Sequence, residues 1–301
     1  ILRPYQFCNL SSVIVRAEDT VDTLKEKVEI ATILGTFQST LTSFPYLRKV
    51  WQTNTEEERL LGVSMTGILD NELLNNAYDE GLPARLEELK NVAVDTNKRL
   101  AAELGINPSA AITCVKPEGT VSQLTGTASG IHPQHSAYFI RRVRSDAKDP
   151  LTSFLKDSGF PWEPCVMKPE STAIFSFPMK TPKGARLRED LNAIEHLDLW
   201  LTFQRHWCEH KPSVTISVNE NEWPKVGAWT WENFDEITGV SYLPMDGGTY
   251  RQAPYESIDE ATYDSLLSAM PTTIDWEQMR EVTDNVEGAQ TLSCTAGGCE
   301  I

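Results

Sequence analysis

The chain has 301 residues, of which 40% are hydrophobic and 23% are charged, and its formal net charge is −16. This is the composition of a soluble globular protein with room for one large domain or two smaller ones. The acidic charge argues against a nucleic-acid-binding surface, which needs clustered lysine and arginine. No apolar run of about 18 residues occurs and no signal-peptide pattern opens the chain, so we expect no membrane partner. Because the chain begins with Ile1 in a stretch typical of a domain interior, we expect a fragment or a processed product.

The first hundred residues predict strands that alternate with helices. Residues 1–15 end in a β-branched run, which predicts a buried strand. A helical period follows over about 20–41. An apolar strand is predicted over 59–68, and a second amphipathic helix over about 83–104. This order predicts a parallel α/β arrangement.

A strand, a break and a small-residue turn follow one another over residues 110–124. The strand breaks at Pro117, and the turn precedes an expected helix. Gly119 lets the backbone approach a ligand closely, while Thr120 and Ser122 can donate hydroxyl hydrogen bonds. Free N–H groups at the start of a helix bind phosphate. An ordinary helix cap has the same sequence features, so the spacing leaves both interpretations open.

Two further stretches favour a ligand without specifying one. The small-residue loop 125–133 includes His132, and its glycines indicate a close approach to a ligand or to another backbone. A plain tight turn is equally consistent with it. Arg141, Arg142 and Arg144 form a basic patch that suits an anion or local ion pairs.

The second half predicts a surface excursion over 146–190, containing a strand at 173–177, and a Gly-, Pro- and Tyr-rich loop over 242–255. The other elements expected there are a helix over 190–209, a strand over 213–218, a helix over about 231–237 and a helix over about 259–270.

The six cysteines are too few for a disulfide framework in a chain of this length. Cys114, Cys165 and Cys208 have no metal-like spacing and are interpreted as buried or incidental thiols. The stretch 206–210, with two histidines and a cysteine, comes nearest to a zinc pattern, but its place at the end of a predicted helix favours a structural role. We therefore expect no metal site.

The tail carries Cys294 and Cys299, separated by four small or polar residues that include two glycines. Such a segment can fold back and bring the two sulfurs together. A mobile dithiol of this kind can carry electrons by thiol–disulfide exchange. The alternative is two unrelated cysteines in a frayed terminus.

Four segments together resemble one enzyme family: Phe7–Leu10, Lys116–Leu124, Gly247–Tyr255 and the C-x4-C tail. In this order they resemble the C-terminal part of the catalytic chain of adenosylcobalamin-dependent (class II) ribonucleotide reductase, of the ribonucleoside-triphosphate type. The resemblance implies a ten-stranded α/β barrel with a finger loop that carries the radical cysteine. That loop would precede Ile1. We therefore expect the chain to need an upstream half, supplied by a split gene or an intein-interrupted gene.

The resemblance implies a domain plan and specific roles. Residues 1–285 would belong to the barrel and 286–301 to a flexible redox tail. Cys8 would be the second cysteine of the active-site redox pair. Cys294 and Cys299 would re-reduce that disulfide, with thioredoxin or a glutaredoxin-like protein as partner. The substrate-phosphate residues would be Pro117, Glu118, Gly119, Thr120, Val121 and Ser122. The cobalamin region would span about 129–142 and about 247–255, and its named residues would be Ser129, Gly130, Ile131, His132, Gly247, Gly248 and Tyr250.

The resemblance implies a cytoplasmic enzyme that reduces ribonucleoside triphosphates by thiyl-radical chemistry. The chain has no Tyr-Tyr pair, unlike the oxygen-dependent class, and no C-terminal glycyl-radical motif. Both features favour the cobalamin class. One alternative is a non-catalytic protein whose tail dithiol binds a metal or a redox partner. Another is a stand-alone disulfide oxidoreductase, which would need a CxxC motif that this chain lacks.

Overall fold

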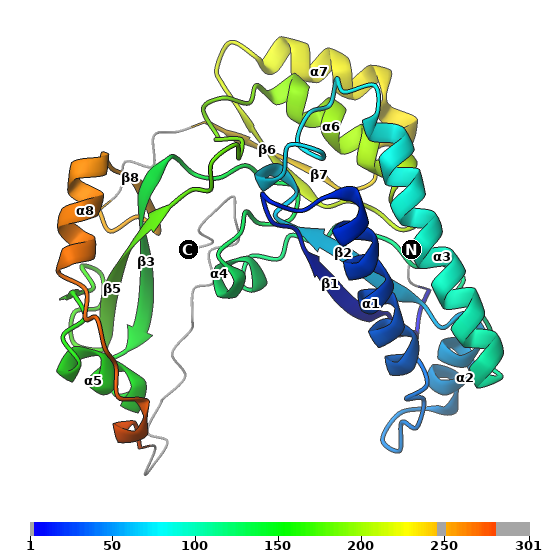
Figure 1. Ribbon diagram of the computed structural model, residues 1–301, viewed down its shortest axis with the longest axis horizontal. Helices are drawn as coiled ribbons and strands as arrows, with labels where there is room; N and C mark the ends of the chain where they lie inside the picture. Colours follow the sequence, from blue (N-terminus) through cyan, green and yellow to red (C-terminus); the bar gives the residue numbers. More distant parts are fainter. Residues whose placement is uncertain (1–2, 246–250, 281–301) are drawn as a thin grey trace. The chain divides into compact units, whose positions relative to one another are not determined.

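The computed structural model describes residues 3–245 and 251–280 (Figure 1). These residues form two compact units. The first comprises 3–134 and 182–245, and the second comprises 135–181 and 251–280. None of the helices in the described ranges has the length and apolarity needed to cross a lipid bilayer.

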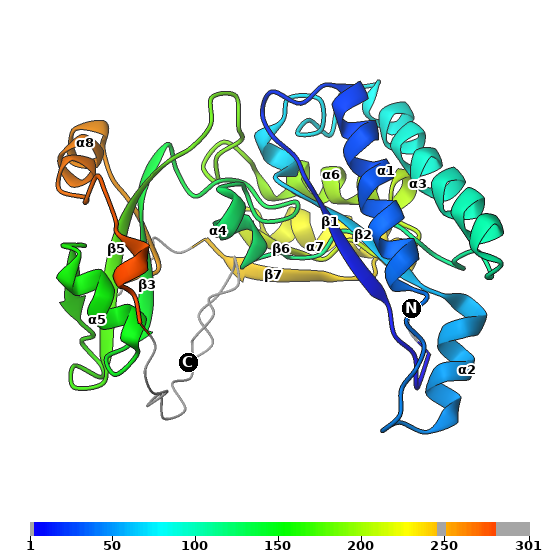
Figure 2. The same cartoon turned by 60° about the horizontal axis from the view of Figure 1, so that its bottom comes forward.

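The first unit is built on parallel strands that follow one another in chain order (Figure 2). Strand β1 (Asn9–Ile14) pairs with β2 (Leu61–Thr66), and β6 (Val214–Val218) pairs with β7 (Val240–Pro244). Parallel bridges from Val63 to Thr113 and from Val115 to Pro212 connect the two pairs through the strand-like segment 111–115. The described residues thus form four parallel strands and one strand-like segment, in the parallel arrangement that the sequence analysis predicts, and show only part of the ten-stranded barrel that the resemblance implies.

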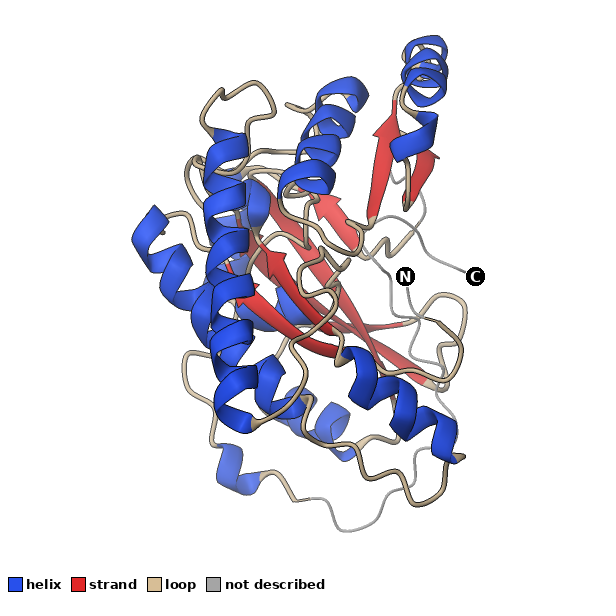
Figure 3. Cartoon of the chain, turned by 90° about the vertical axis from the view of Figure 1, so that its right-hand side faces the viewer, coloured by secondary structure: helices blue, strands red, loops and turns tan. Residues whose placement is uncertain are grey.

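Helices cover the apolar face of these strands (Figure 3). Helix α1 packs on β1 and β2 and against α3, which packs against α6, and α6 in turn packs on β6 and against α7. The helical elements of this unit are α1 (Val21–Gln38), α2 (Lys49–Glu58), α3 (Leu82–Leu104), α4 (Val121–Thr125), α6 (Ala193–His206) and α7 (Trp223–Glu232), with 3-10 turns η1 (Ile68–Asp70) and η2 (Phe234–Glu236).

The core of the first unit lies between the strands and these helices. Val13 and Val63 are fully buried there, on neighbouring strands. Two tryptophan side chains, one in α6 and one directly after it, form hydrogen bonds to the segments next to the strands. The indole of Trp200 donates to the carbonyl of Pro212 at 2.9 Å, and that of Trp207 donates to the carbonyl of Cys114 at 2.8 Å. Both rings therefore bury their area without losing a hydrogen bond.

The second unit is a small antiparallel sheet with short helices. Its strand order is β4-β5-β3-β8, and its core centres on Phe160, Ala173 and Phe175. The elements are β3 (Tyr138–Asp146), α5 (Pro150–Asp157), β4 (Trp162–Pro164), β5 (Thr172–Lys180), β8 (Tyr255–Ser257), α8 (Glu260–Ser268) and the 3-10 turn η3 (Trp276–Gln278).

Several local predictions were wrong or incomplete, including the three that follow. The helix expected at 231–237 lies earlier, as α7, because Pro224 fits the first turn of a helix and starts it there. Helix α2 was not predicted, since its mostly polar sequence has a weak apolar period. Strand β3 was not predicted either, because its arginines, which include Arg141 and Arg142, interrupt the expected alternation.

Candidate active site

One face of the parallel strands carries thiols and small or polar side chains. Successive strand residues point to opposite faces, so Leu10 and Ser12 of β1 share a face that Val13 does not. In the register of the β1–β2 pair, Leu10 lies opposite Gly62 and Ser12 opposite Ser64. This face is the one that the helices of the first unit leave free.

Cys8 and Cys114 approach each other over a glycine. Their sulfurs lie 3.3 and 3.5 Å from the point that a Cβ on Gly62 would occupy. Strand β2 nevertheless separates the two backbones, so their Cα atoms lie at least two strand spacings apart, roughly 9–10 Å. A disulfide requires about 4.4–6.8 Å. Cys114 is therefore a neighbour of Cys8 and not its disulfide partner, and both thiols are free.

Burial keeps both thiols protonated. It raises the pKa of Cys8 to about 11, against the opposing positive charge of Lys116. Burial also raises the pKa of Cys114 to about 12, and the nearby Cys8 adds to this shift. At neutral pH the face therefore presents Cys8 as a thiol, the form that can donate a hydrogen to a substrate.

The turn after Pro117 leaves backbone donors available. Ser122 is buried, and its N–H donates to the carbonyl of Glu118 at 3.0 Å. The N–H groups of Gly119, Thr120 and Val121 donate no hydrogen bond to any residue that the structure describes. Consecutive free N–H groups in an accessible turn suit a phosphate.

The loop 125–133 packs against this turn. Gly130 has a φ of +55°, and a Cβ there would lie 2.5 Å from the carbonyl oxygen of Lys116. The hydroxyl of Ser129 donates to the carbonyl of Pro117. The two small-residue loops predicted as separate ligand-binding stretches are therefore packed on each other.

His132 holds the same loop through both ring nitrogens. Its Nε2 accepts from the N–H of Thr215 at 2.9 Å, so Nδ1 carries the proton and donates to the carbonyl of Ser129 at 2.7 Å. The neighbouring His196 donates from Nε2 to the carbonyl of Ile131 at 2.8 Å. Burial lowers the pKa of His132, and burial with His132 beside it lowers the pKa of His196 to about 3. Both rings are neutral supports of the loop.

In the second unit, strand pairing joins two stretches that the sequence analysis assigned to the cobalamin region. The N–H of Arg142 donates to the carbonyl of Pro254 at 2.8 Å, beside the β3–β8 pairing. The guanidinium carbon of Arg141 lies 4.7 Å from the centroid of the Tyr255 ring, and His135 stacks on that ring at 5.4 Å. The Nε of Arg141 is buried without a hydrogen-bond partner among the described residues.

The remaining predicted site residues lie outside the described ranges: Gly247, Gly248, Tyr250, Cys294 and Cys299. Within those ranges, no group of three or more His, Cys, Asp or Glu side chains could hold a metal ion. In the stretch 206–210, His206 bonds to Glu87 and His210 to the carbonyl of Leu61.

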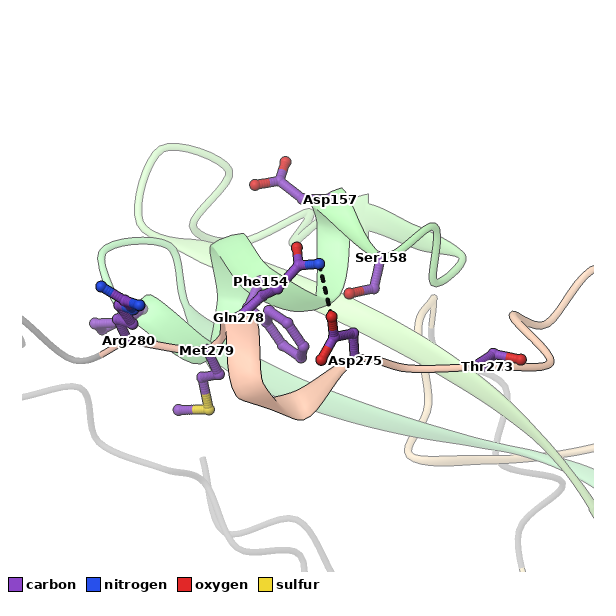
Figure 4. Close-up of a pocket in the computed structure, with 9 residues that line it drawn as sticks. Phe154, Asp157, Ser158, Thr273, Asp275, Gln278, Met279 and Arg280 are labelled. Carbon is purple, nitrogen blue, oxygen red and sulfur yellow. Dashed lines mark hydrogen bonds between the residues drawn. The ribbon is translucent and has the colours of Figure 1, made fainter.

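A cavity of about 400 Å³ lies in the second unit, between α5 and the segment around η3 (Figure 4). Gln278 and Asp275 are hydrogen-bonded at its rim. It contains none of the predicted site residues, and we assign it no role.

The sequence analysis did not assign Ser12, Gly62 or Cys114 to the site. The alternation along β1 after Cys8 was a signal that could have marked Ser12. The other two residues become neighbours of Cys8 only through the pairing of β1, β2 and the segment 111–115.

Comparisons with known proteins agree on one family, although no protein-family model matches the chain. The chain is 27% identical over 303 residues to the adenosylcobalamin-dependent ribonucleoside-triphosphate reductase of Euglena gracilis, covering 99% of this chain and 40% of that protein. It is 28% identical over 325 residues to the enzyme of the same name from Lactobacillus acidophilus, covering 98% and 43%.

A solved B12-dependent (class II) ribonucleotide reductase has the same fold. The TM-score is 0.78 at 25% sequence identity, over 91% of this chain and 41% of that one. The chain thus spans about two fifths of the length of the proteins that it matches. In sequence and in fold, the chain is similar to about two fifths of the catalytic chain of class II, adenosylcobalamin-dependent ribonucleotide reductases.

Proposed function

We propose that this chain supplies a reducing thiol and the substrate-phosphate site of an adenosylcobalamin-dependent ribonucleoside-triphosphate reductase. One observation carries the proposal. Cys8 lies directly before β1 and the turn 117–122 follows the segment 111–115, and both of these segments pair with β2, in a chain whose relatives are such reductases.

The chemistry requires two thiols. Replacing the 2′-hydroxyl of a ribose by hydrogen consumes two electrons and two protons, which two thiols supply as they become a disulfide, and the hydroxyl leaves as water. Cys8 is one of these thiols, and its high pKa keeps the required proton on sulfur. Since Cys114 cannot reach it, the second thiol comes from an upstream half.

Adenosylcobalamin is the cofactor of this proposal. Its amide side chains and its phosphate need hydrogen-bond donors, and Arg141 fits, since its Nε is buried without a hydrogen-bond partner among the described residues. Arg141 and Tyr255 would contact it from the second unit, together with the predicted residues Gly247, Gly248 and Tyr250. When bound, the cofactor supplies the radical that starts the reaction. Ser129, Gly130, Ile131 and His132 remain predicted residues of the cobalamin region, with His132 acting through the loop that it holds.

Cys294 and Cys299 complete the cycle. A disulfide that includes the partly buried Cys8 is poorly accessible to a protein reductant, because exchange requires direct attack on sulfur. The tail dithiol carries electrons to it from thioredoxin or a glutaredoxin-like protein. A cytoplasmic location is part of the same proposal.

The test is reconstitution. The chain is joined to, or co-expressed with, an upstream half that carries the finger loop, and reduction of ATP or CTP is measured with adenosylcobalamin. Thioredoxin and a small dithiol serve as alternative reductants. We expect activity with both. Cys294→Ser and Cys299→Ser should lose only the thioredoxin-driven activity.

Cys8→Ser should stop multiple turnover with either reductant, and Cys165→Ser, in the second unit, should not. Multiple turnover by Cys8→Ser would contradict the assignment of the reducing thiol. Tail variants that behave as wild type would contradict the electron-carrier role. The non-catalytic alternative is not favoured, because the relatives are enzymes.

A further inference from the structure

Glu118 has an unfavourable backbone conformation in the middle of the proposed phosphate turn. Its φ is +56°, a region that residues other than glycine rarely adopt. Its carboxylate is directed inward, with only 1% of the side chain exposed. Arrangements of this kind persist where the surroundings enforce them, and they cluster at ligand-binding segments.

Two side chains enforce the conformation. The hydroxyl of Ser12 donates to Oε1 of Glu118 at 2.5 Å. The Nζ of Lys116 lies 3.2 Å from the same Oε1 and donates to the Ser12 hydroxyl at 3.2 Å. The other oxygen, Oε2, is buried without a hydrogen-bond partner among the described residues, which adds a desolvation cost. We call Ser12, Lys116 and Glu118 the carboxylate clamp.

The clamp connects two parts of the site that are distant in the sequence. Ser12 belongs to β1, and Cys8 lies directly before the first residue of that strand. Glu118 belongs to the turn 117–122. Cys8 and Ser12 are four residues apart and point to the same face. The clamp therefore fixes the turn relative to the strand that carries the reducing sulfur.

We propose that the carboxylate clamp presets the N–H groups of Gly119, Thr120 and Val121 for the substrate phosphates, and that Ser12 is a positioning residue of the reductase. This inference rests on the proposed function. Glu118 forms an ion pair with Lys116, so the lysine is held within the clamp. Phosphate recognition then depends on how the backbone N–H groups are oriented.

The test compares adjacent serines in the reconstituted reductase. Ser12→Ala removes the hydroxyl of the clamp without a change of charge. Ser11→Ala is the matched control, since the Ser11 hydroxyl is buried on the same strand and bonds to no described residue. We expect Ser12→Ala to raise KM for the nucleotide roughly tenfold, the effect of losing a hydrogen bond to a charged group. The inhibition constant of inorganic tripolyphosphate should rise in proportion, while kcat changes less than KM.

Two further variants distinguish a loss of positioning by Ser12 from a general loss of structure. Ser12→Thr keeps the hydroxyl and should restore KM. Glu118→Gly adopts a positive φ without strain, so adding Ser12→Ala to it should change KM little. The clamp is refuted if Ser12→Ala matches Ser11→Ala, or if its effect persists undiminished in the Glu118→Gly background. A wild-type reconstituted enzyme that reduces no nucleotide would overturn the proposed function, and the clamp with it.

Discussion

At the residue scale, the behaviour of Cys8 depends on two opposing influences. Burial raises its pKa to about 11, and the positive charge of Lys116 opposes the shift. A thiol with a raised pKa reacts slowly as a nucleophile at neutral pH, because only the thiolate attacks. At pH values below this pKa, the thiolate fraction of Cys8 rises about tenfold for each unit by which the pH increases.

Lys116→Met should therefore raise the pKa of Cys8 further. The alkylation of Cys8 by iodoacetamide should be slower in this variant than in wild type at pH 8 and should rise with pH in both proteins. Mass spectrometry of the Cys8 peptide measures the rate. Lys98→Met, an exposed change on α3, is the control. Equal rates in Lys116→Met and wild type would show that Lys116 does not act on this thiol.

His196 predicts a pH dependence of stability. Its pKa in the folded chain is about 3, below the usual 6.5, so the unfolded chain binds more protons between these values. The free energy of unfolding should therefore fall as the pH drops below 6.5, by at most about 1.4 kcal/mol per pH unit from this group. His196→Gln still has an N–H for Ile131 but does not titrate. Urea unfolding at pH 7 and pH 5 should show a smaller pH effect in this variant, and an unchanged effect would contradict the assignment.

At the element scale, two glycines of the loop 125–133 differ in what surrounds them. Gly126 and Gly130 both have positive φ, +65° and +55°. A Cβ on Gly126 would meet nothing within 4 Å, whereas one on Gly130 would contact the backbone of Lys116. At position 126 only the positive φ favours glycine. At position 130 both the positive φ and the close packing on Lys116 favour it.

Gly126→Ala should cost about 1 kcal/mol of unfolding free energy, the strain of a left-handed residue. Gly130→Ala should cost clearly more, because the backbone of Lys116 cannot move aside as a flexible side chain would. In the reconstituted reductase it should also raise KM for the nucleotide, since it displaces the turn. Urea unfolding and steady-state kinetics measure both effects. Equal stability losses in the two variants would show that the loops are not packed as described.

At the scale of the whole molecule, the parallel sheet of the first unit has two open edges. In the residues that the structure describes, β1 pairs only with β2 and β7 pairs only with β6. Leu10, on the helix-free face, is 52% exposed. Open strand edges and exposed apolar side chains favour association with other chains.

The chain without an upstream half should therefore self-associate as its concentration rises. Sedimentation velocity over a range of concentrations measures this association. Under the proposed function, co-expression with the upstream half should suppress it, because strands of that half would cover the same surfaces. A chain that remains monomeric at high concentration would show that these edges are already protected.

The sequence by itself determined the features that depend on local pattern. The order of strands and helices in the first hundred residues follows from apolar periodicity, and the parallel pairing of β1 with β2 confirms it. The family was also recognisable, because short motifs around Cys8 and Pro117 keep their order along the chain. The roles of the tail cysteines remain predictions.

Only the tertiary structure decided which distant residues meet. Ser12 and Glu118 are 106 positions apart, and no periodicity predicts their hydrogen bond. The approach of Cys114 to Cys8 depends on the strand between them and on a glycine that has no side chain to intervene. The arginines of β3 prevented its prediction from the sequence, and its pairing with β5 and β8 identifies it as a strand. Contacts of this kind follow from strand register and close packing, which are properties of the assembled fold and not of any segment alone.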